Sequence, residues 1–100
     1  MRLTVRILET AAEYLTGLKE AEQGTIRADM EAMRAGDFDS VRTKQLKGPI
    51  RELKVGDHRI TYFRSKNILY FVRGFRKKSA KTPKNEIRQA EKIYRMMNRD

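Results

Sequence analysis

The sequence predicts a small α+β fold, in which two N-terminal helices and one C-terminal helix pack on an antiparallel sheet. Apolar and polar residues alternate over residues 2–7 and again over residues 50–63, as in half-buried strands. Apolar residues recur at helical spacing over residues 9–36 and 83–97. Between two apolar runs stands Gly56-Asp57, a typical hairpin turn. The expected order is βααβββα, in one domain spanning residues 1–100.

The N-terminal third is expected to form a strand and then helices. After the strand at residues 2–7, the period changes at Glu9 or Thr10, and Thr10 is a candidate N-cap. Gly24 interrupts the apolar run, and Gly36 stands where a helix C-terminal cap is expected. Two short helices fit this pattern, as does one longer helix that tolerates Gly24.

The middle of the chain is expected to form a β-hairpin. Residues 36–48 read as a connection, and the hairpin turn then sets Lys54 opposite Arg59. Opposite residues share a face of the sheet, so this register divides the hairpin into an apolar and a polar face. The apolar face collects Leu53, Val55, His58, Ile60 and Tyr62. The polar face collects Glu52, Lys54, Arg59 and Thr61.

The last strand and helix follow a second turn at residues 65–67. Residues 68–75 are apolar on both faces, which predicts a central strand covered from both sides. Pro83 suits the first turn of the closing helix, with Thr82 as its N-cap. The apolar stripe of this helix is Ile87, Ala90, Ile93, Tyr94 and Met97, and the cations off the stripe are Arg88, Lys92, Arg95 and Arg99.

Charge is distributed unevenly along the chain. The formal net charge is +10 and the pI about 10.2. Residues 1–40 hold five Lys and Arg against eight Asp and Glu, a net of −3, whereas residues 41–100 have a net of +13. Such asymmetry indicates nucleic acid, an acidic protein or an anionic membrane as partner, although an uneven surface without a partner is the plainer interpretation.

Several classes of protein are disfavoured. The chain has no cysteine, which excludes disulfides and thiolate zinc sites. Its start lacks the apolar run of a signal peptide, and no segment approaches the roughly 20 apolar residues of a membrane span, so a cytoplasmic location is expected. There is one histidine and no His-Glu-x-x-His motif, so no metal ion is expected.

The remaining candidates for chemistry are cations. Arg59 projects from the polar face of the hairpin, and the cluster at residues 76–78 can close over it. Arg and Lys can neutralise the charge that develops on a phosphate during phosphoryl transfer, and the RNA 2′-hydroxyl is an internal nucleophile. Composition alone nevertheless favours binding over catalysis. His58 points to the apolar face and is expected to be structural.

Residues 50–63 and 68–97 resemble the RelE/ParE superfamily of type II toxin–antitoxin toxins, in particular its HigB-like, phage-related branch. The matching motifs are Glu52-Leu53, His58-Arg59, Gly74-Phe75-Arg76-Lys77-Lys78, Thr82-Pro83, and Glu86 with Ala90. The resemblance implies a ribosome-associated mRNA endonuclease that needs no cofactor. It also implies a hetero-oligomer with a cognate antitoxin, expected to be of the helix-turn-helix type.

The resemblance also implies roles for individual residues. Arg59 is expected to contact the scissile phosphate, and Lys77 and Lys78 fall at basic catalytic positions. The neighbouring cations expected to bind RNA are Lys54, Arg73, Arg76, Lys81 and Lys84. The tyrosine, histidine or acid that some relatives carry near the C-terminus is missing at residues 82–84, so the proton-transfer residue is unassigned.

Two alternatives to the endonuclease stay open. One is a gyrase-inhibiting toxin of the ParE type, which acts by binding a protein. The other is a regulator that binds nucleic acid without cutting it. In addition, Glu52 occupies a strand position that is basic in some relatives, so their mechanism does not transfer whole.

Overall fold

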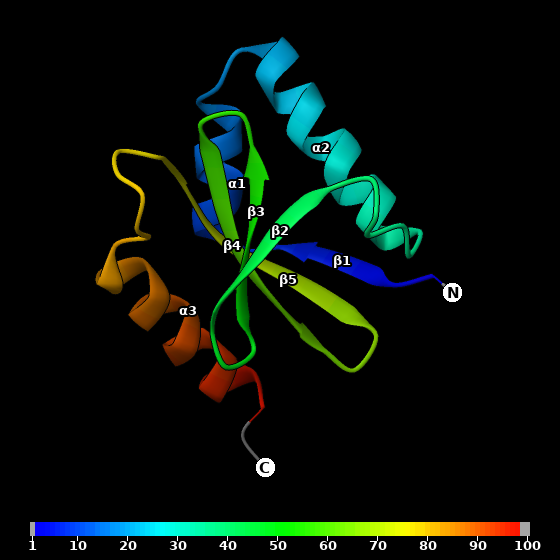
Figure 1. Cartoon of the computed structure of the whole chain (residues 1–100). Helices are drawn as coiled ribbons and strands as arrows, with labels where there is room; N and C mark the ends of the chain where they lie inside the picture. Colours follow the sequence, from blue (N-terminus) through cyan, green and yellow to red (C-terminus); the bar gives the residue numbers. More distant parts are fainter. Residues whose placement is uncertain (1, 99–100) are drawn as a thin grey trace.

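The computed structural model describes residues 2–98 and confirms the α+β fold (Figure 1). The elements are β1 (Thr4–Ile7), α1 (Glu9–Thr16), α2 (Glu20–Arg34), β2 (Arg42–Lys47), β3 (Ile50–Val55), β4 (His58–Ser65), β5 (Ile68–Arg76) and α3 (Lys84–Met97). The predicted position of Arg99 off the α3 stripe lies outside the described residues. Within residues 2–98, every helix is too short or too polar to cross a membrane.

The five strands form one mixed sheet in the order β1-β5-β4-β3-β2. β1 runs parallel to β5, with Thr4 opposite Ile68, and the other pairs are antiparallel. The prediction of a purely antiparallel sheet was therefore wrong at this edge. The direction of β1 depends on the path that the chain takes through α1 and α2 before it returns, and the residues of β1 carry no signal for that path.

The segment 36–48 was predicted to be a connection, but it contains the edge strand β2, paired with β3. The order is thus βααββββα. The alternation of apolar and polar residues that marks a half-buried strand is missing in β2, because β2 is largely exposed and polar, with Leu46 as its one apolar residue. Lysines on an edge strand are a common protection against pairing with other chains, and they hide the strand from a hydrophobicity pattern.

The helical region divides into two helices, as one of the two predictions had it, but the break lies at residues 17–19 and not at Gly24. Gly24 lies inside α2 on an exposed face, where a glycine costs only about 1 kcal/mol relative to alanine. Gly36 ends α2 as predicted. Its N–H reaches the carbonyl of Met33, and its φ of 86° turns the chain so that the N–H of Asp37 reaches the carbonyl of Ala32.

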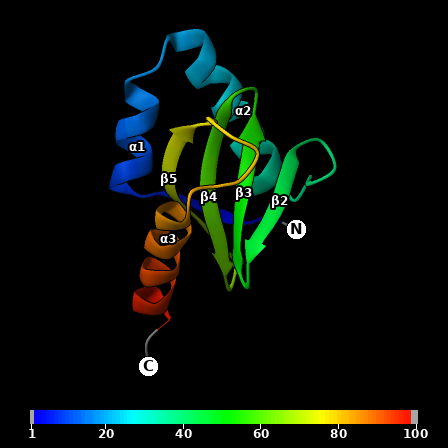
Figure 2. The same ribbon diagram turned by 60° about the vertical axis from the view of Figure 1, so that its left-hand side comes forward.

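Helices cover both faces of the sheet (Figure 2). The larger core lies under α1 and α2 and contains Leu15, Ile26, Leu53, Ile60 and Phe71 among others. The smaller core lies under α3 and contains Ile50, Phe63, Val72 and Ala90. β5 contributes Phe71 to one core and Val72 to the other, which confirms that it is covered on both sides.

The predicted hairpin register is confirmed, with Val55 opposite His58 and Lys54 opposite Arg59. The apolar face lies in the larger core as expected. On the polar face, however, Glu52 is only 3% exposed and Thr61 is fully buried. The segment 77–83, here called the strap, crosses this face in front of β4 and β3 before α3 begins (Figure 2).

Three details of the helix ends differ from prediction. Thr10 and Thr82 do not cap α1 and α3, because their hydroxyls donate to the Val72 carbonyl and the Glu52 carboxylate. The α3 stripe holds at Ala90, but Met97, in the last turn of α3, is 46% exposed.

Candidate functional site

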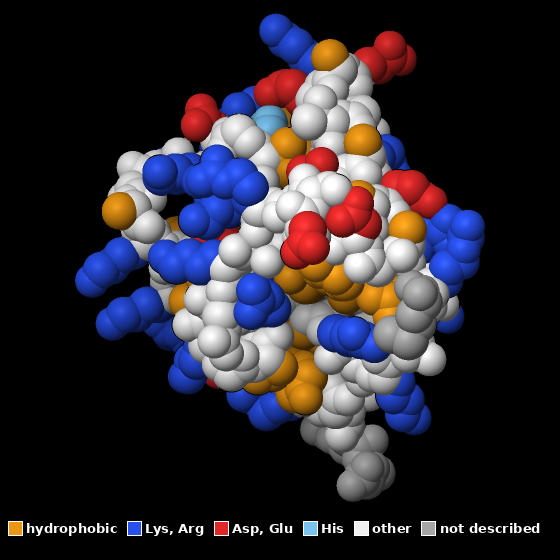
Figure 3. All heavy atoms as spheres, turned by 45° about the vertical axis from the view of Figure 1, so that its right-hand side comes forward, with side chains coloured by type: hydrophobic (Ala, Val, Ile, Leu, Met, Phe, Trp, Pro, Cys, Tyr) orange, Lys and Arg blue, Asp and Glu red, His pale blue; other side chains and the backbone are white. Residues whose placement is uncertain are grey.

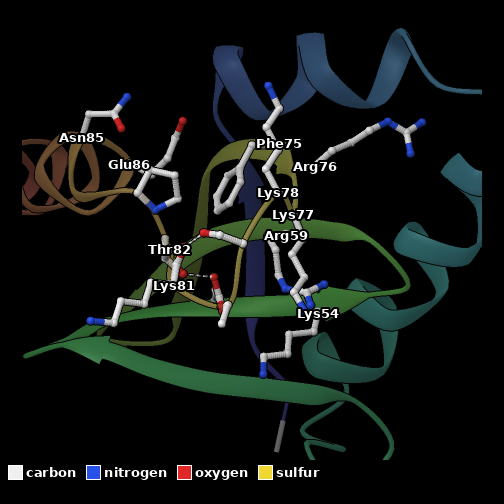
Figure 4. Close-up of a pocket in the computed structure, with 14 residues that line it drawn as sticks. Lys54, Arg59, Phe75, Arg76, Lys77, Lys78, Lys81, Thr82, Asn85 and Glu86 are labelled. Atoms are coloured by element: carbon white, nitrogen blue, oxygen red, sulfur yellow. Dashed lines mark hydrogen bonds between the residues drawn. The ribbon is translucent and has the colours of Figure 1, made fainter.

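A groove of about 240 Å³ opens over the polar face of the β3–β4 hairpin, between the hairpin and the strap (Figure 4). α3 packs on the other half of this face. The strap, together with the first turn of α3, borders the half that carries Glu52 and Arg59. The lining of the groove comprises Glu52, Lys54, Arg59, Phe75, Arg76, Lys77, Lys78, Ser79, Ala80, Lys81, Thr82, Pro83, Asn85 and Glu86. We call it the catalytic groove after the function proposed below; six of its fourteen lining residues are Lys or Arg.

Six of the eight cations predicted to act on RNA line the catalytic groove: Lys54, Arg59, Arg76, Lys77, Lys78 and Lys81. They come from β3, β4, the end of β5 and the strap, four segments that the fold brings to one place. Arg59, Lys77 and Lys54 lie together at the centre of the view in Figure 4, whereas Arg76 points away toward α2. There its Nη2 lies 3.5 Å from Oε2 of Glu22.

The Arg59 side chain is fixed by backbone carbonyls. Its Nη1 donates to the carbonyl of Gly56 at 2.7 Å and to that of His58 at 2.9 Å. Among the described contacts its Nη2 and Nε have no protein partner, and no carboxylate lies within 4.0 Å. Arg59 therefore does not form an ion pair with Glu52 in this structure. A guanidinium held at one nitrogen and open at two can bind a phosphate.

Two carboxylates lie among these cations, and their surroundings differ. Oε1 of Glu86 accepts from Nε of Arg73 at 2.7 Å, which neutralises both groups. Oε1 of Glu52 accepts from the Thr82 hydroxyl at 2.7 Å, a neutral donor. Among the described hydrogen bonds Oε2 of Glu52 has no protein partner. Glu52 is thus a buried carboxylate with one free oxygen beside several cations, which is the arrangement of a proton acceptor.

Sequence reasoning did not identify Glu52 as a functional residue. The hairpin register did place it on the polar face with Arg59, and that shared face was the available signal. The Thr82 contact joins residues 30 positions apart in the chain, so only the fold could show it.

Two predicted RNA-binding residues lie outside the catalytic groove. Arg73 pairs with Glu86 and so fastens α3 to β5, with a third of its side chain exposed. Lys84 begins α3 and lines a neighbouring groove instead. The start of α3 explains both positions. Because the Thr82 hydroxyl bonds to Glu52, α3 begins at Lys84, and this places Lys84 at the neighbouring groove. Glu86 then lies in the first turn of α3, where its carboxylate accepts from Arg73.

On the opposite face of the hairpin, the buried His58 is hydrogen-bonded to two half-buried side chains. It is 5% exposed; its Nδ1 lies 2.6 Å from the Tyr14 hydroxyl and its Nε2 lies 3.0 Å from Oε2 of Glu22. The bond to His58 lowers the pKa of Glu22, with a smaller contribution from Arg76, and burial raises the pKa of Tyr14. His58 therefore joins α1, α2 and β4, and its predicted orientation toward the core is confirmed.

The same contact explains the glycine in the Gly-Phe-Arg-Lys-Lys motif. The ring of Tyr14 lies against Gly74 so closely that a Cβ atom there would be 2.3 Å from its Cδ2. Glycine at this position lets α1 approach β5 and lets Tyr14 reach His58.

Acidic and basic side chains occupy different parts of the surface (Figure 3). Lys and Arg gather on the left flank of that view, whereas Asp and Glu lie toward its top and centre. Within residues 2–98 no three His, Asp or Glu side chains form a cluster that could hold a metal ion. In the catalytic groove, positive charge is supplied by lysine and arginine.

Comparison with solved structures shows the fold of RelE toxins. The chain of a RelE–RelB complex from Pyrococcus horikoshii superposes with a TM-score of 0.69 at 15% identity, and covers 80% of this chain and 100% of that one. A chain of the toxin–antitoxin complex RelBE2 from Mycobacterium tuberculosis gives a TM-score of 0.62 at 14% identity. The superposition covers 77% of this chain and 100% of that one. A chain of a RelB–RelE complex from Methanococcus jannaschii gives a TM-score of 0.61 at 16% identity. That superposition covers 70% of this chain and 87% of that one.

At the level of sequence, a search of curated proteins found no match. The family described as Phage derived protein Gp49-like (DUF891) matches residues 13–95. That match runs from the second half of α1 to the last turn of α3 and includes the hairpin and the strap. The predicted RelE-like fold is thus confirmed, while the HigB-like branch stays a prediction. The chain belongs to the Gp49-like family of phage-derived proteins.

Proposed function

We propose that this protein is the toxin of a toxin–antitoxin pair and that it cuts mRNA in the catalytic groove. The observation that carries the proposal is the placement of Arg59 and Glu52 on one face of the hairpin, diagonal to each other. Diagonal neighbours in an antiparallel pair lie about 7–8 Å apart, which leaves room for a phosphodiester between the two side chains. The RelE fold supports the assignment.

The chemistry uses the RNA 2′-hydroxyl as nucleophile. Oε2 of Glu52 takes the proton as the 2′-oxygen attacks the adjacent phosphorus. The bond from phosphorus to the 5′-oxygen breaks, and that oxygen takes a proton from Lys77, Lys78 or a water. The products are a 2′,3′-cyclic phosphate and a 5′-hydroxyl. Arg59 holds the phosphate oxygens, where a fixed donor is worth about 10²–10³ in rate.

The substrate is single-stranded mRNA on the ribosome, and the protein acts in the cytoplasm. The chain's net charge of +10 suits a complex with ribosomal RNA as well as with the message. The reaction needs no metal ion or cofactor, because the cations of the catalytic groove stabilise the charge that develops on the phosphate.

The partner that neutralises the toxin is an antitoxin with an acidic segment that covers the catalytic groove. Three of the similar structures are complexes of RelE with RelB or of the RelBE2 pair. Four exposed cations of the groove, Arg76, Lys77, Lys78 and Lys81, attract such a segment, so the association rate should fall steeply with salt. Rates that stay constant from low to high salt would contradict the electrostatic part of this proposal.

Induction of the protein alone tests the proposed activity. Growth should arrest, translation should fall before DNA supercoiling changes, and new RNA ends with 5′-hydroxyls should appear within translated messages. Early loss of supercoiling with intact messages would favour a gyrase inhibitor instead. Retention on RNA without new ends would favour a regulator that only binds.

A further inference from the structure

A second, shallower groove of about 600 Å³ lies beside the catalytic groove, between β2, the strap and the first turn of α3. Its lining is Lys44, Gln45, Leu46, Ser79, Lys81, Thr82, Pro83, Lys84 and Ile87. Four strap residues, Ser79, Lys81, Thr82 and Pro83, line both grooves. The strap is therefore a common wall, and a chain-like ligand can pass from one groove to the other.

The flanking groove, as we call this second groove, carries positive charge without compensation. No acidic residue lines it, and its lysines are Lys44, Lys81 and Lys84, all exposed. None of the three has a carboxylate within 4.0 Å among the described residues, whereas Lys47 nearby pairs with Glu91 at 3.4 Å. Unpaired lysines on one wall of a groove create a potential that attracts polyanions.

Between the lysines, the flanking groove offers apolar surface. Leu46 and Ile87 are half-buried there, and Pro83 is exposed. Its polar groups are few, since the Gln45 amide already donates to the Gly48 carbonyl and the Thr82 hydroxyl to Glu52. Lysines beside apolar side chains can hold phosphates and the flat faces of bases, but they read little sequence.

We propose that the flanking groove binds the single-stranded RNA next to the scissile phosphate. This inference rests on the proposed function, which it deepens by adding a subsite that holds the substrate outside the reacting atoms. Lys44 and Lys84 contact phosphates there, on the two sides of the groove, and Lys81 on the strap serves both grooves. The subsite strengthens binding without strong base preference, so sequence preference must arise elsewhere.

The test measures binding of a 2′-O-methyl RNA decamer, which has no free 2′-hydroxyl and is not cut, by fluorescence anisotropy at several salt concentrations. Lys44→Ala with Lys84→Ala should weaken binding by about tenfold and lower the slope of log Kd against log salt by about 1.4, the value for two phosphate contacts with a single strand. The matched control is Arg88→Ala with Lys92→Ala, an equal loss of charge at exposed α3 positions outside both grooves. The control should change Kd by less than about twofold.

A crosslinking arm locates the RNA. 4-Thiouridine placed on one side of the scissile linkage should crosslink to peptides from β2 or the first turn of α3, and on the other side it should not. Equal Kd values for the double variant and its control would overturn the subsite while leaving the proposed function intact, provided that wild type cuts RNA and Arg59→Ala does not. Loss of affinity for poly-glutamate alone would instead assign the flanking groove to an acidic protein segment.

Discussion

The Thr82 hydroxyl donates a hydrogen bond to the buried carboxylate of Glu52 at 2.7 Å, and this bond ties the strap to the middle of β3. It holds the basic strap over the polar face of the hairpin, so the cations and the carboxylate reach one groove. It also orients Glu52, because one carboxylate oxygen is occupied and the other is left toward the cations. The contact thus shapes the groove and positions the carboxylate that we propose as its proton acceptor.

Replacing Glu52 separates these two effects. Glu52→Gln keeps the side-chain shape and an oxygen that can accept from Thr82, but it removes the basic oxygen. RNA cleavage should fall by about 10²–10⁴, the usual contribution of a general base, while the thermal midpoint stays near that of wild type. Thr82→Val, which removes the bond and keeps the carboxylate, should cost far less in rate. Initial rates and thermal midpoints check both variants, and full activity in Glu52→Gln would remove Glu52 from the mechanism.

Arg59→Ala should abolish cleavage while leaving the protein folded. The side chain is half-buried and bonded only to backbone carbonyls that water can reach, so its loss costs little packing. The rate should fall by about 10²–10³, or roughly 3–4 kcal/mol of transition-state stabilisation. Arg64→Ala is the matched control, since Arg64 lies on the same strand and donates to the Lys66 carbonyl outside the groove. Cleavage rates equal in the two variants would contradict the assignment.

The strap lysines should contribute in the same way. Lys77→Ala with Lys78→Ala removes two exposed cations of the catalytic groove without touching either core. Since both ammonium groups stabilise charge on the phosphate or donate to the leaving oxygen, cleavage should fall about as far as in Arg59→Ala. The measurement is the initial rate at saturating RNA. A rate within threefold of wild type, with only weaker binding, would reduce these lysines to binding residues.

His58→Ala should act through stability. It removes a buried ring and leaves the half-buried Tyr14 hydroxyl without its partner, which costs about 1–3 kcal/mol. It also leaves Oε2 of Glu22 with Arg76 as its remaining partner. Denaturant unfolding should show a lower midpoint, and cleavage measured where the variant is folded should persist. Tyr14→Phe, which removes one of the two bonds and keeps the ring against Gly74, should give a smaller loss. A normal midpoint with cleavage lost would make His58 a catalytic group instead.

Local patterns predicted the parts of this fold that depend on neighbouring residues. The turn at Gly56 fixed the register of the hairpin and placed Arg59 correctly, because a two-residue turn allows one pairing. The polar edge strand β2 and the parallel pairing of β1 were not predicted, since both depend on partners far along the chain.

The site was predictable to the same degree. Its cations follow from charge density along residues 54–81, but a charge pattern cannot tell a free arginine from a paired one. Arg73 belongs to an ion pair with Glu86, and Lys84 belongs to the flanking groove. The orientation of the Glu52 carboxylate depends on its hydrogen bond from Thr82, and the sequence pattern had assigned Thr82 as the N-cap of the last helix. Where two interpretations of a short polar side chain compete, the tertiary partner decides.

Acid should weaken the contact between α2 and the hairpin through Glu22. Its folded-state pKa is lowered below the ordinary value of 4.5, chiefly by the bond to His58 and then by Arg76. Below pH 4.5 the unfolded chain therefore binds more protons than the folded one, so this contribution to the free energy of unfolding is complete above pH 4.5 and is lost as the pH falls through the folded-state pKa. In Glu22→Gln the contribution is absent at every pH.

Denaturant unfolding at a series of pH values, from about 3 to 6, measures this contribution as the difference between wild type and Glu22→Gln. The difference should shrink as the pH falls. The Glu31 carboxylate, whose pKa Arg34 lowers, adds its own pH dependence to both proteins and cancels in the difference. Glu20→Gln is the control, because Glu20 lies in the same first turn of α2 with no hydrogen-bond partner among the described contacts. If the Glu22 difference stays constant with pH, or matches that of Glu20→Gln, the bond to His58 does not stabilise the folded protein as a charged pair.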